Sequence, residues 1–170
     1  MPDDAHTATD EERYFVIKGR RWRRTDPSIP ESLRQQLVDE LMGARRAVKA
    51  AKASGVEEQM RAARARVQDA KVALGERGQP WWEAPTDASL DERLMATVRC
   101  LLRHRDSGKT ICPSEAARVV GGDTWRGLMG RTRDVAWRLE EAGWLVVTQR
   151  GERVGSTAKG AIRLRRVEKD

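Results

Sequence analysis

The chain has 170 residues, of which 39% are apolar and 35% are charged, and 33 basic against 26 acidic side chains give a net charge of +7. This composition excludes a large apolar core, so burial has to come from amphipathic elements. No stretch is apolar over the length of a bilayer, and the polar, acidic opening residues do not have the form of a signal peptide, so we expect a cytoplasmic protein with no membrane partner.

The positive charge is concentrated toward the carboxyl terminus. Between Arg126 and Arg166 the sequence has 10 basic and 4 acidic side chains. A locally basic surface favours binding to phosphate backbones, because neutralised charge and released counterions supply the affinity. The alternative is an ordinary solvated surface, and charge alone does not separate these two interpretations.

Two short features open the chain. Residues 1–12 have five acidic side chains and no periodicity, which predicts a disordered leader. The apolar run Tyr14–Ile17, a Lys-Gly pair and the returning segment around Trp22 then predict a small β-hairpin. Six cations and three aromatic side chains lie within Arg13–Arg24, and such a mixture suits either stacking on nucleic acid or a strand pair whose polar face is simply charged.

The next segment predicts an antiparallel pair of helices. Ser28–Glu31 reads as a capping box with proline in the first turn. Apolar side chains then recur at steps of three and four residues on both sides of a break at Ser54-Gly55: Leu33, Leu37, Leu41, Ala44, Val48, Ala51, and then Val56, Met60, Ala63, Val67, Ala70, Leu74. Val38, Met42 and Val72 fall outside this stripe, so we expect the C-terminal half, a homodimer or another protein to cover them. A purely structural arm is the alternative.

The segment Gly75–Asp87 separates the two halves of the chain. It contains two prolines and two glycines, which are typical of a corner or linker. Because Trp81 and Trp82 are costly to leave in water, we expect an anchored corner, with an exposed stacking pair as the alternative. The predicted domains are therefore a β-hairpin plus helical hairpin over residues 13–78, a corner over 79–88 and a second domain over 89–168.

The second half has an informative order of elements. A helix capped by Asp87 or Ser89 ends near Gly108, and a short strand leads to a helix that begins at Pro113. A third helix, capped by Asp123 or Thr124, precedes strands over residues 144–149 and 161–166, with a cationic loop between them. Helix, strand, helix, helix, strand, wing, strand is the order of a winged helix-turn-helix. The predicted fold class is thus α+β, mainly α, with a winged helix-turn-helix domain preceded by a small β-hairpin and an antiparallel helical hairpin.

Particular motifs in this half resemble a bacterial domain family of unknown function with winged-helix character. They are "CPSEAAR" from Cys112, "WRGLM" from Trp125, and "VTQRG" from Val147 with "IRLR" from Ile162, and the resemblance covers Ser89–Arg166. It implies the winged-helix fold and no particular activity, since the family has no established one. The segment "GRRWRRTDPSIPE…LVDELMGARRAV" also resembles the N-terminal part of proteins that carry this domain.

The candidate nucleic-acid-binding residues lie on the third helix and on the wing. We expect Arg126, Arg131 and Arg133 to face a major groove, and glycines at 127 and 130 to allow close approach. On the wing, Arg150, Arg153 and Lys159 are the candidates for phosphate contacts.

Other residues of the third helix argue against this interpretation. Trp137 lies on the face opposite the apolar stripe, and we expect it to pack against the helical hairpin, which would partly cover that face. Asp134, Glu140 and Glu141 place negative charge on the same helix. A wing that is only a solvated hairpin is the alternative.

The sequence has few candidates for catalysis. His104 near a helix end suits the helix dipole, and neither Cys100 nor Cys112 has a partner at metal-ligand spacing, so we expect buried free thiols, no metal and no cofactor. We therefore expect no enzyme. The leading hypothesis is a nucleic-acid-binding protein that binds duplex DNA, with transcriptional regulation as its expected role. The alternative is a protein-interaction module whose winged helix does not bind DNA.

Overall fold

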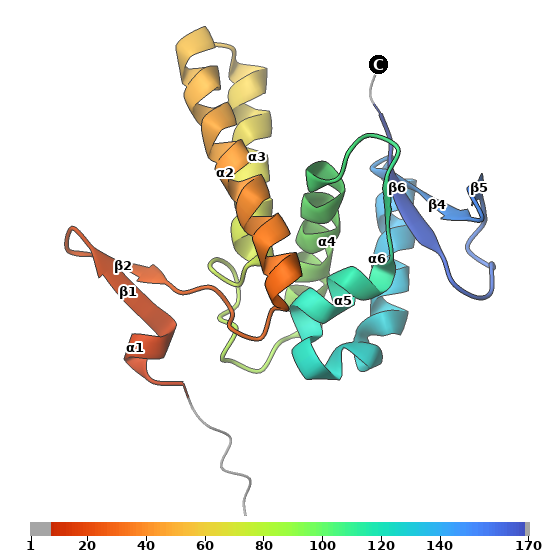
Figure 1. The fold of residues 1–170 in the computed structure, drawn as a ribbon, viewed down its shortest axis with the longest axis horizontal. Helices are drawn as coiled ribbons and strands as arrows, with labels where there is room; N and C mark the ends of the chain where they lie inside the picture. The colour runs from red at the N-terminus through yellow and green to blue at the C-terminus, as the bar shows by residue number, and fades with distance from the viewer. Residues whose placement is uncertain (1–7, 169–170) are drawn as a thin grey trace, which may run out of the picture.

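The computed structural model describes residues 8–168 as a mainly helical α+β fold (Figure 1). The N-terminal half contains α1 (Asp10–Arg13), β1 (Tyr14–Ile17), β2 (Arg20–Arg23), α2 (Glu31–Ser54) and α3 (Glu57–Ala73). The C-terminal half contains α4 (Asp87–His104), β3 (Thr110–Ile111), α5 (Pro113–Gly121), the 3-10 helix η1 (Gly122–Leu128), α6 (Met129–Glu141), β4 (Leu145–Gln149), β5 (Glu152–Arg153) and β6 (Arg163–Arg166).

The N-terminal β-hairpin is confirmed. β1 and β2 pair antiparallel with Ile17 opposite Arg20, and the two turn residues, Lys18 and Gly19, have positive φ angles of 50° and 75°. These angles are those of a two-residue turn whose twist matches the strands.

The predicted leader differs from the structure at residues 10–12, which belong to α1 and are capped by Thr9. Residues 1–7 of this leader lie outside the described part of the chain.

Helices α2 and α3 form the predicted antiparallel hairpin, and Gly55 ends α2 with a φ of 69°. Alanines line the seam between the helices, and Ala44, Ala51 and Ala63 are buried there, which lets the axes come close. The predicted capping box is wrong. Ser28 instead donates from its backbone N and its Oγ to Oδ1 of Asp26, at 2.9 and 2.7 Å, and α2 begins after Pro30 without a side-chain cap.

The corner between the halves is anchored by tryptophan, as predicted. The Nε1 of Trp81 donates to the carbonyl of Arg24 at 3.1 Å. The ring of Trp82 packs edge-on against the rings of Trp81 and Tyr14, with centroids 5.1 and 5.3 Å apart. The corner therefore also fixes the start of the β-hairpin.

The C-terminal half has the predicted order of helices and strands. Its antiparallel sheet has the strand order β3-β6-β4-β5, and the short β5 is an addition to the predicted strands. The predicted cap of α4 is wrong by one to three residues, because Thr86 caps the helix by accepting from the backbone N of Ser89 at 3.0 Å. Asp87 and Ser89 lie inside the first turn.

The third predicted helix is divided in two. Residues from Gly122 to Leu128 form η1, and α6 begins only at Met129. Gly122 has φ 52° and ψ −128°, so the backbone changes direction just ahead of the predicted third helix. Thr124 also departs from helical angles, and the first part of that predicted helix is a 3-10 helix. Trp125 and Arg126 consequently lie on η1 rather than on α6.

One continuous apolar core joins the two halves. It runs from Leu33 and Leu37 on α2 through Leu101 on α4 to Val135 on α6 and Leu164 on β6. Of the side chains predicted to need cover, Val72 is buried and Val38 packs against this core, whereas Met42 is exposed. The helical hairpin therefore docks on the C-terminal half along α4.

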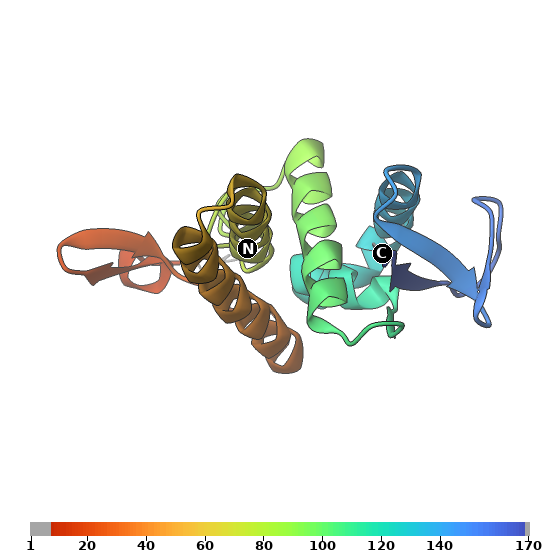
Figure 2. The ribbon, with the colours of Figure 1, turned by 90° about the horizontal axis from the view of Figure 1, so that it is seen from above.

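Helix α4 stands between the helical hairpin and α6 (Figures 1 and 2). Trp137 is half-buried against the core, and α6 packs on α4, α5 and β4. The expectation that the hairpin would cover α6 through Trp137 is therefore wrong, and the outer face of α6 is left open by the hairpin.

Both cysteines are free, with Cys100 buried and Cys112 half-buried. Burial raises the pKa of the Cys100 thiol far above its ordinary value.

Within residues 8–168 no helix combines the length and the apolarity needed to cross a membrane.

Candidate nucleic-acid interface

The six predicted contact residues are distributed over five segments of the C-terminal half. They are Arg126 on η1, Arg131 and Arg133 on α6, Arg150 in the turn between β4 and β5, Arg153 on β5, and Lys159 in the loop before β6. Their side chains have three different roles in the structure.

Arg131 is half-buried and is held against α4 by carboxylates of that helix. Its guanidinium pairs with Asp87 at 2.7 Å and with Asp91 at 2.9 Å, and Arg138 also pairs with Asp91 at 2.9 Å. Burial opposes ionisation of Asp91, but hydrogen bonds from the two arginines outweigh it and lower the pKa of this carboxyl. Arg131 thus fastens α6 to α4, a role that the sequence spacing did not indicate.

Arg133 fastens the wing loop, which runs between Val154 and Ile162 from β5 to β6, to α6. Its guanidinium donates to the carbonyl oxygens of Gly160 and Ala158, at 2.9 and 3.2 Å. The Nε2 of Gln149 donates to the carbonyl of Lys159 at 2.7 Å. The glycine-rich loop is therefore positioned alongside the first two turns of α6.

The wing presents cations of two kinds. Arg153 is exposed, and its Nε donates to Oε1 of Glu140 on α6 at 3.2 Å. Arg150 and Lys159 are also exposed, and within residues 8–168 their side chains have no hydrogen-bond or ion-pair partner. Arg150 has a φ of 51°, because it occupies the first position of the two-residue turn with Gly151. These two cations are available to a ligand.

A third cationic group lies at the corner between α5 and η1. The guanidinium groups of Arg118 and Arg126 lie 4.7 and 4.6 Å from the ring centroid of Trp125. Both arginines are exposed. Arg118 was not among the predicted contact residues, because its position beside Arg126 depends on the turn through Gly121-Gly122.

Two glycines, one at the end of η1 and one at the start of α6, leave a surface without side chains, which we call the bare start of α6. A Cβ built on Gly127 or on Gly130 would have no atom within 4 Å, and neither residue has a positive φ. Neither packing nor backbone geometry thus requires glycine at these positions. Gly130 precedes Arg133 by three residues and so lies beside it on the helix surface, which places the bare surface next to the wing loop. The exposed Asp134 follows one turn after Gly130.

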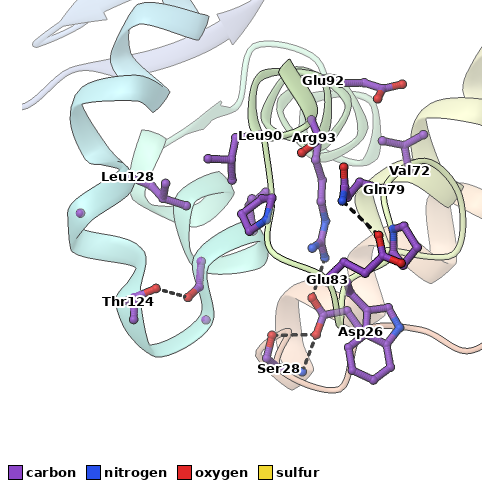
Figure 3. A pocket seen from close by; sticks show the side chains of 18 of the residues that line it. Asp26, Ser28, Val72, Gln79, Glu83, Leu90, Glu92, Arg93, Thr124 and Leu128 are labelled. Carbon is purple, nitrogen blue, oxygen red and sulfur yellow. Dashed lines mark hydrogen bonds and ion pairs between the residues drawn. The ribbon is translucent and has the colours of Figure 1, made fainter. Parts of the chain in front are cut away.

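A pocket of about 580 Å³ lies beside η1, where the two halves meet, and Gly127 is among its lining residues (Figure 3). Arg93 crosses its wall to reach Asp26, at 2.9 Å, and Leu90 and Leu128 supply apolar surface. The charged pair is satisfied within the protein. Among residues 8–168 no group of three or more His, Cys, Asp or Glu side chains is placed to hold a metal ion.

Comparison with protein families identifies the C-terminal part of the chain. Residues 91–167 match the family described as "Protein of unknown function (DUF3253)". The match confirms the resemblance to a domain family of unknown function for this segment; the resemblance of the N-terminal segment stays a prediction. No curated protein matches the chain.

The DUF3253 domain contains every one of the six predicted contact residues, together with Arg118 and Gly130. The N-terminal hairpins and the first turn of α4 precede the match. Asp91, the carboxylate shared by Arg131 and Arg138, is its first residue. The bare start of α6, the wing loop held by Arg133 and the exposed cations Arg150 and Lys159 thus all lie within the matched segment of this chain.

Proposed function

We propose that the protein binds duplex DNA through the DUF3253 domain, used as a winged helix. The bare start of α6 would approach the major groove, while Arg150 and Lys159 on the wing contact phosphates. Arg118 and Arg126 at the corner with α5 would flank the groove. This division follows the usual one between groove-facing helix and backbone-contacting wing.

The observation that carries the proposal is the glycine at position 130. Glycine in a helix costs about 1 kcal/mol of stability relative to alanine, and nothing within the fold requires it there. A close approach of another molecule explains why the surface is left without a side chain. The adjacent wing supplies unpaired positive charge for a phosphate backbone, and Arg131 and Arg133 support the proposal as positioning residues.

Salt-dependent binding tests the wing. We expect the protein to bind a labelled random-sequence 20-bp duplex in a polarisation assay with strong salt dependence. Arg150→Gln with Lys159→Gln should weaken binding about tenfold at low salt and reduce the slope of log K against log salt by about 2, because two phosphate contacts are lost. The matched control is Arg34→Gln with Arg61→Gln, which removes the same charge from exposed helix pairs. Equal affinities for the wing and control variants would contradict the wing contact.

Substitution of Gly130 separates folding from binding. We expect Gly130→Gln to raise the free energy of unfolding by about 0.5–1 kcal/mol, because glutamine is the better helix former. The same substitution should weaken duplex binding at least tenfold, because the added side chain fills the surface that approaches the groove. Urea denaturation and polarisation measure the two effects. Unchanged binding by a variant of raised stability would rule out docking at the start of α6.

A further inference from the structure

A second concentration of positive charge lies on the N-terminal half, away from the wing. It consists of Arg20 on β2, Arg45 on α2, Arg64 and Lys71 on α3, and Arg77 after α3, and we call it the cationic cluster. The four arginines are exposed, whereas Lys71 is buried. These residues come from four segments of the chain that the helical hairpin and β-hairpin bring together.

Two structural features connect the members of the cluster. Arg45, Arg64 and Arg77 line one shallow groove of about 610 Å³ on the helical hairpin, together with Val48 and Val67. The ring of Trp22 then joins the remaining two, because its centroid lies 4.3 Å from the guanidinium carbon of Arg20 and 4.9 Å from Nζ of Lys71.

The charges of the cluster are poorly compensated. Three other arginines of this hairpin are paired, Arg34 with Glu31, Arg61 with Glu58 and Arg66 with Glu40, whereas Arg46 has no ion-pair partner within residues 8–168. Within residues 8–168 no carboxylate forms an ion pair with Arg20, Arg45, Arg64 or Arg77. Arg77 donates to the neutral Gln68 at 2.6 Å, and Glu76 lies 3.8 Å from Lys71.

Mutual repulsion within the cluster is visible at its buried member. Burial lowers the pKa of the Lys71 ammonium group; Glu76 opposes this change, and the positive charges of Arg77, Arg45 and Arg20 add to it. A protein that holds like charges together in this way gains most from an anion that neutralises several of them at once. Arginine also offers paired donors that match phosphate oxygens.

We propose that the cationic cluster is a second binding site for the phosphate backbone of duplex DNA. It is separate from the wing, since the cluster lies on the hairpins and the wing lies beyond α4 and α6 (Figure 1). This second site and the proposed function have the same class of ligand, duplex DNA, but they rest on different residues. The groove and the exposed arginines hold the backbone through charge and hydrogen bonds without reading bases, so this site should not discriminate between sequences.

The test uses the full chain and a labelled random-sequence 30-bp duplex in a polarisation assay. The cluster variant is Arg45→Gln with Arg64→Gln, and the control is again Arg34→Gln with Arg61→Gln. We expect the cluster variant to bind at least tenfold more weakly than the control at low salt. Because Arg45, Arg64 and Arg61 are exposed and Arg34 is half-buried in a surface pair with Glu31, thermal unfolding should change little, which verifies that binding is compared between folded proteins.

Combination with the wing variant Arg150→Gln with Lys159→Gln separates the two sites. We expect residual binding of the wing variant to fall at least tenfold further when the cluster is also changed. A cluster variant that binds like the control in both backgrounds would overturn the second site and leave the wing untouched. Loss of binding on changing the cluster, with no effect of the wing, would instead overturn the proposed function and uphold the cluster.

The source of the phosphate is tested by competition. Inorganic phosphate added at constant ionic strength should not displace the 30-bp duplex from the wing variant, because a single ion replaces only part of the series of contacts that a DNA backbone makes along the cluster. Displacement by millimolar phosphate would show a small-anion site and overturn the assignment to a DNA backbone.

Discussion

Replacing Asp69 with alanine is expected to lower the free energy of unfolding by about 3–5 kcal/mol, the usual cost of removing one partner of a buried ion pair. Asp69 is buried at the face of α3 that meets α4. Its carboxylate accepts from Nε and Nη2 of Arg99 at 2.9 and 2.7 Å, and from Nη1 of Arg103 at 2.6 Å. The substitution would leave two guanidinium groups largely enclosed without a counter-charge.

Chemical denaturation measures this effect, and Asp39→Ala is the matched control. Asp39 is an exposed carboxylate on α2 that accepts a hydrogen bond from Gln35, so its removal should cost less than about 0.5 kcal/mol. Asp69→Asn keeps the size and an acceptor but removes the charge, and it should fall between the two. A loss below about 1 kcal/mol for Asp69→Ala would show that Arg99 and Arg103 reach solvent easily, and that apolar contacts alone hold α3 to α4.

Asp26→Ala is expected to have a comparable effect, again about 3–5 kcal/mol, for a different reason. Asp26 lies in the connection between β2 and α2 and is 5% exposed. Its carboxylate accepts from Arg93 on α4 at 2.9 Å and holds the turn at Ser28, while its backbone N donates to the carbonyl of Leu74 at 2.9 Å. The side chain of Asp26 thus joins the start of α2 to α4, and its backbone adds the link to the end of α3, which the substitution leaves in place.

The control for Asp26 is Glu31→Ala, which removes an exposed pair with Arg34 on the same helix and should cost less than about 1 kcal/mol. Urea unfolding followed by circular dichroism compares the two variants. Asp26→Asn should retain the hydrogen bonds to Ser28 while weakening the contact with Arg93, and should therefore unfold less easily than Asp26→Ala. Equal stability of the Asp26→Ala and Glu31→Ala variants would contradict a structural role for the buried pair.

Local patterns in the sequence were sufficient for most of the fold. The apolar spacing from Leu33 to Leu74, interrupted by glycine at 55, depends only on helical geometry and predicted the helical hairpin. The Lys-Gly pair at 18 and 19 likewise predicted a turn from local geometry alone, because a two-residue hairpin turn needs positive φ angles and glycine adopts them readily. Where the backbone departs from regular geometry, prediction failed: the apolar spacing of Trp125 and Leu128 continues that of α6, yet Gly122–Leu128 form the 3-10 helix η1, within which Thr124 departs from helical angles.

The candidate site was less predictable, because it depends on which charges meet across the fold. Arg131 and Arg150 look equivalent in the sequence. The structure places carboxylates from α4 against Arg131, about 40 residues away in the chain, whereas no carboxylate of residues 8–168 pairs with Arg150. Arg118 and the cationic cluster were missed for the same reason, since their members come from separate elements.

The charges of α4 constrain how the chain can change in length. Arg93, Arg99 and Arg103 point to partners on the N-terminal half, and Asp91 to partners on α6. One inserted or deleted residue within α4 would rotate everything after it by about 100° around the helix axis, and the later arginines would lose their partners. The wing loop between Val154 and Ile162 is held through backbone carbonyl oxygens, which accept from Arg133 and Gln149. Residues of any type supply such oxygens, so a longer loop can keep these contacts. Related chains should therefore differ in length at the wing and keep α4 constant.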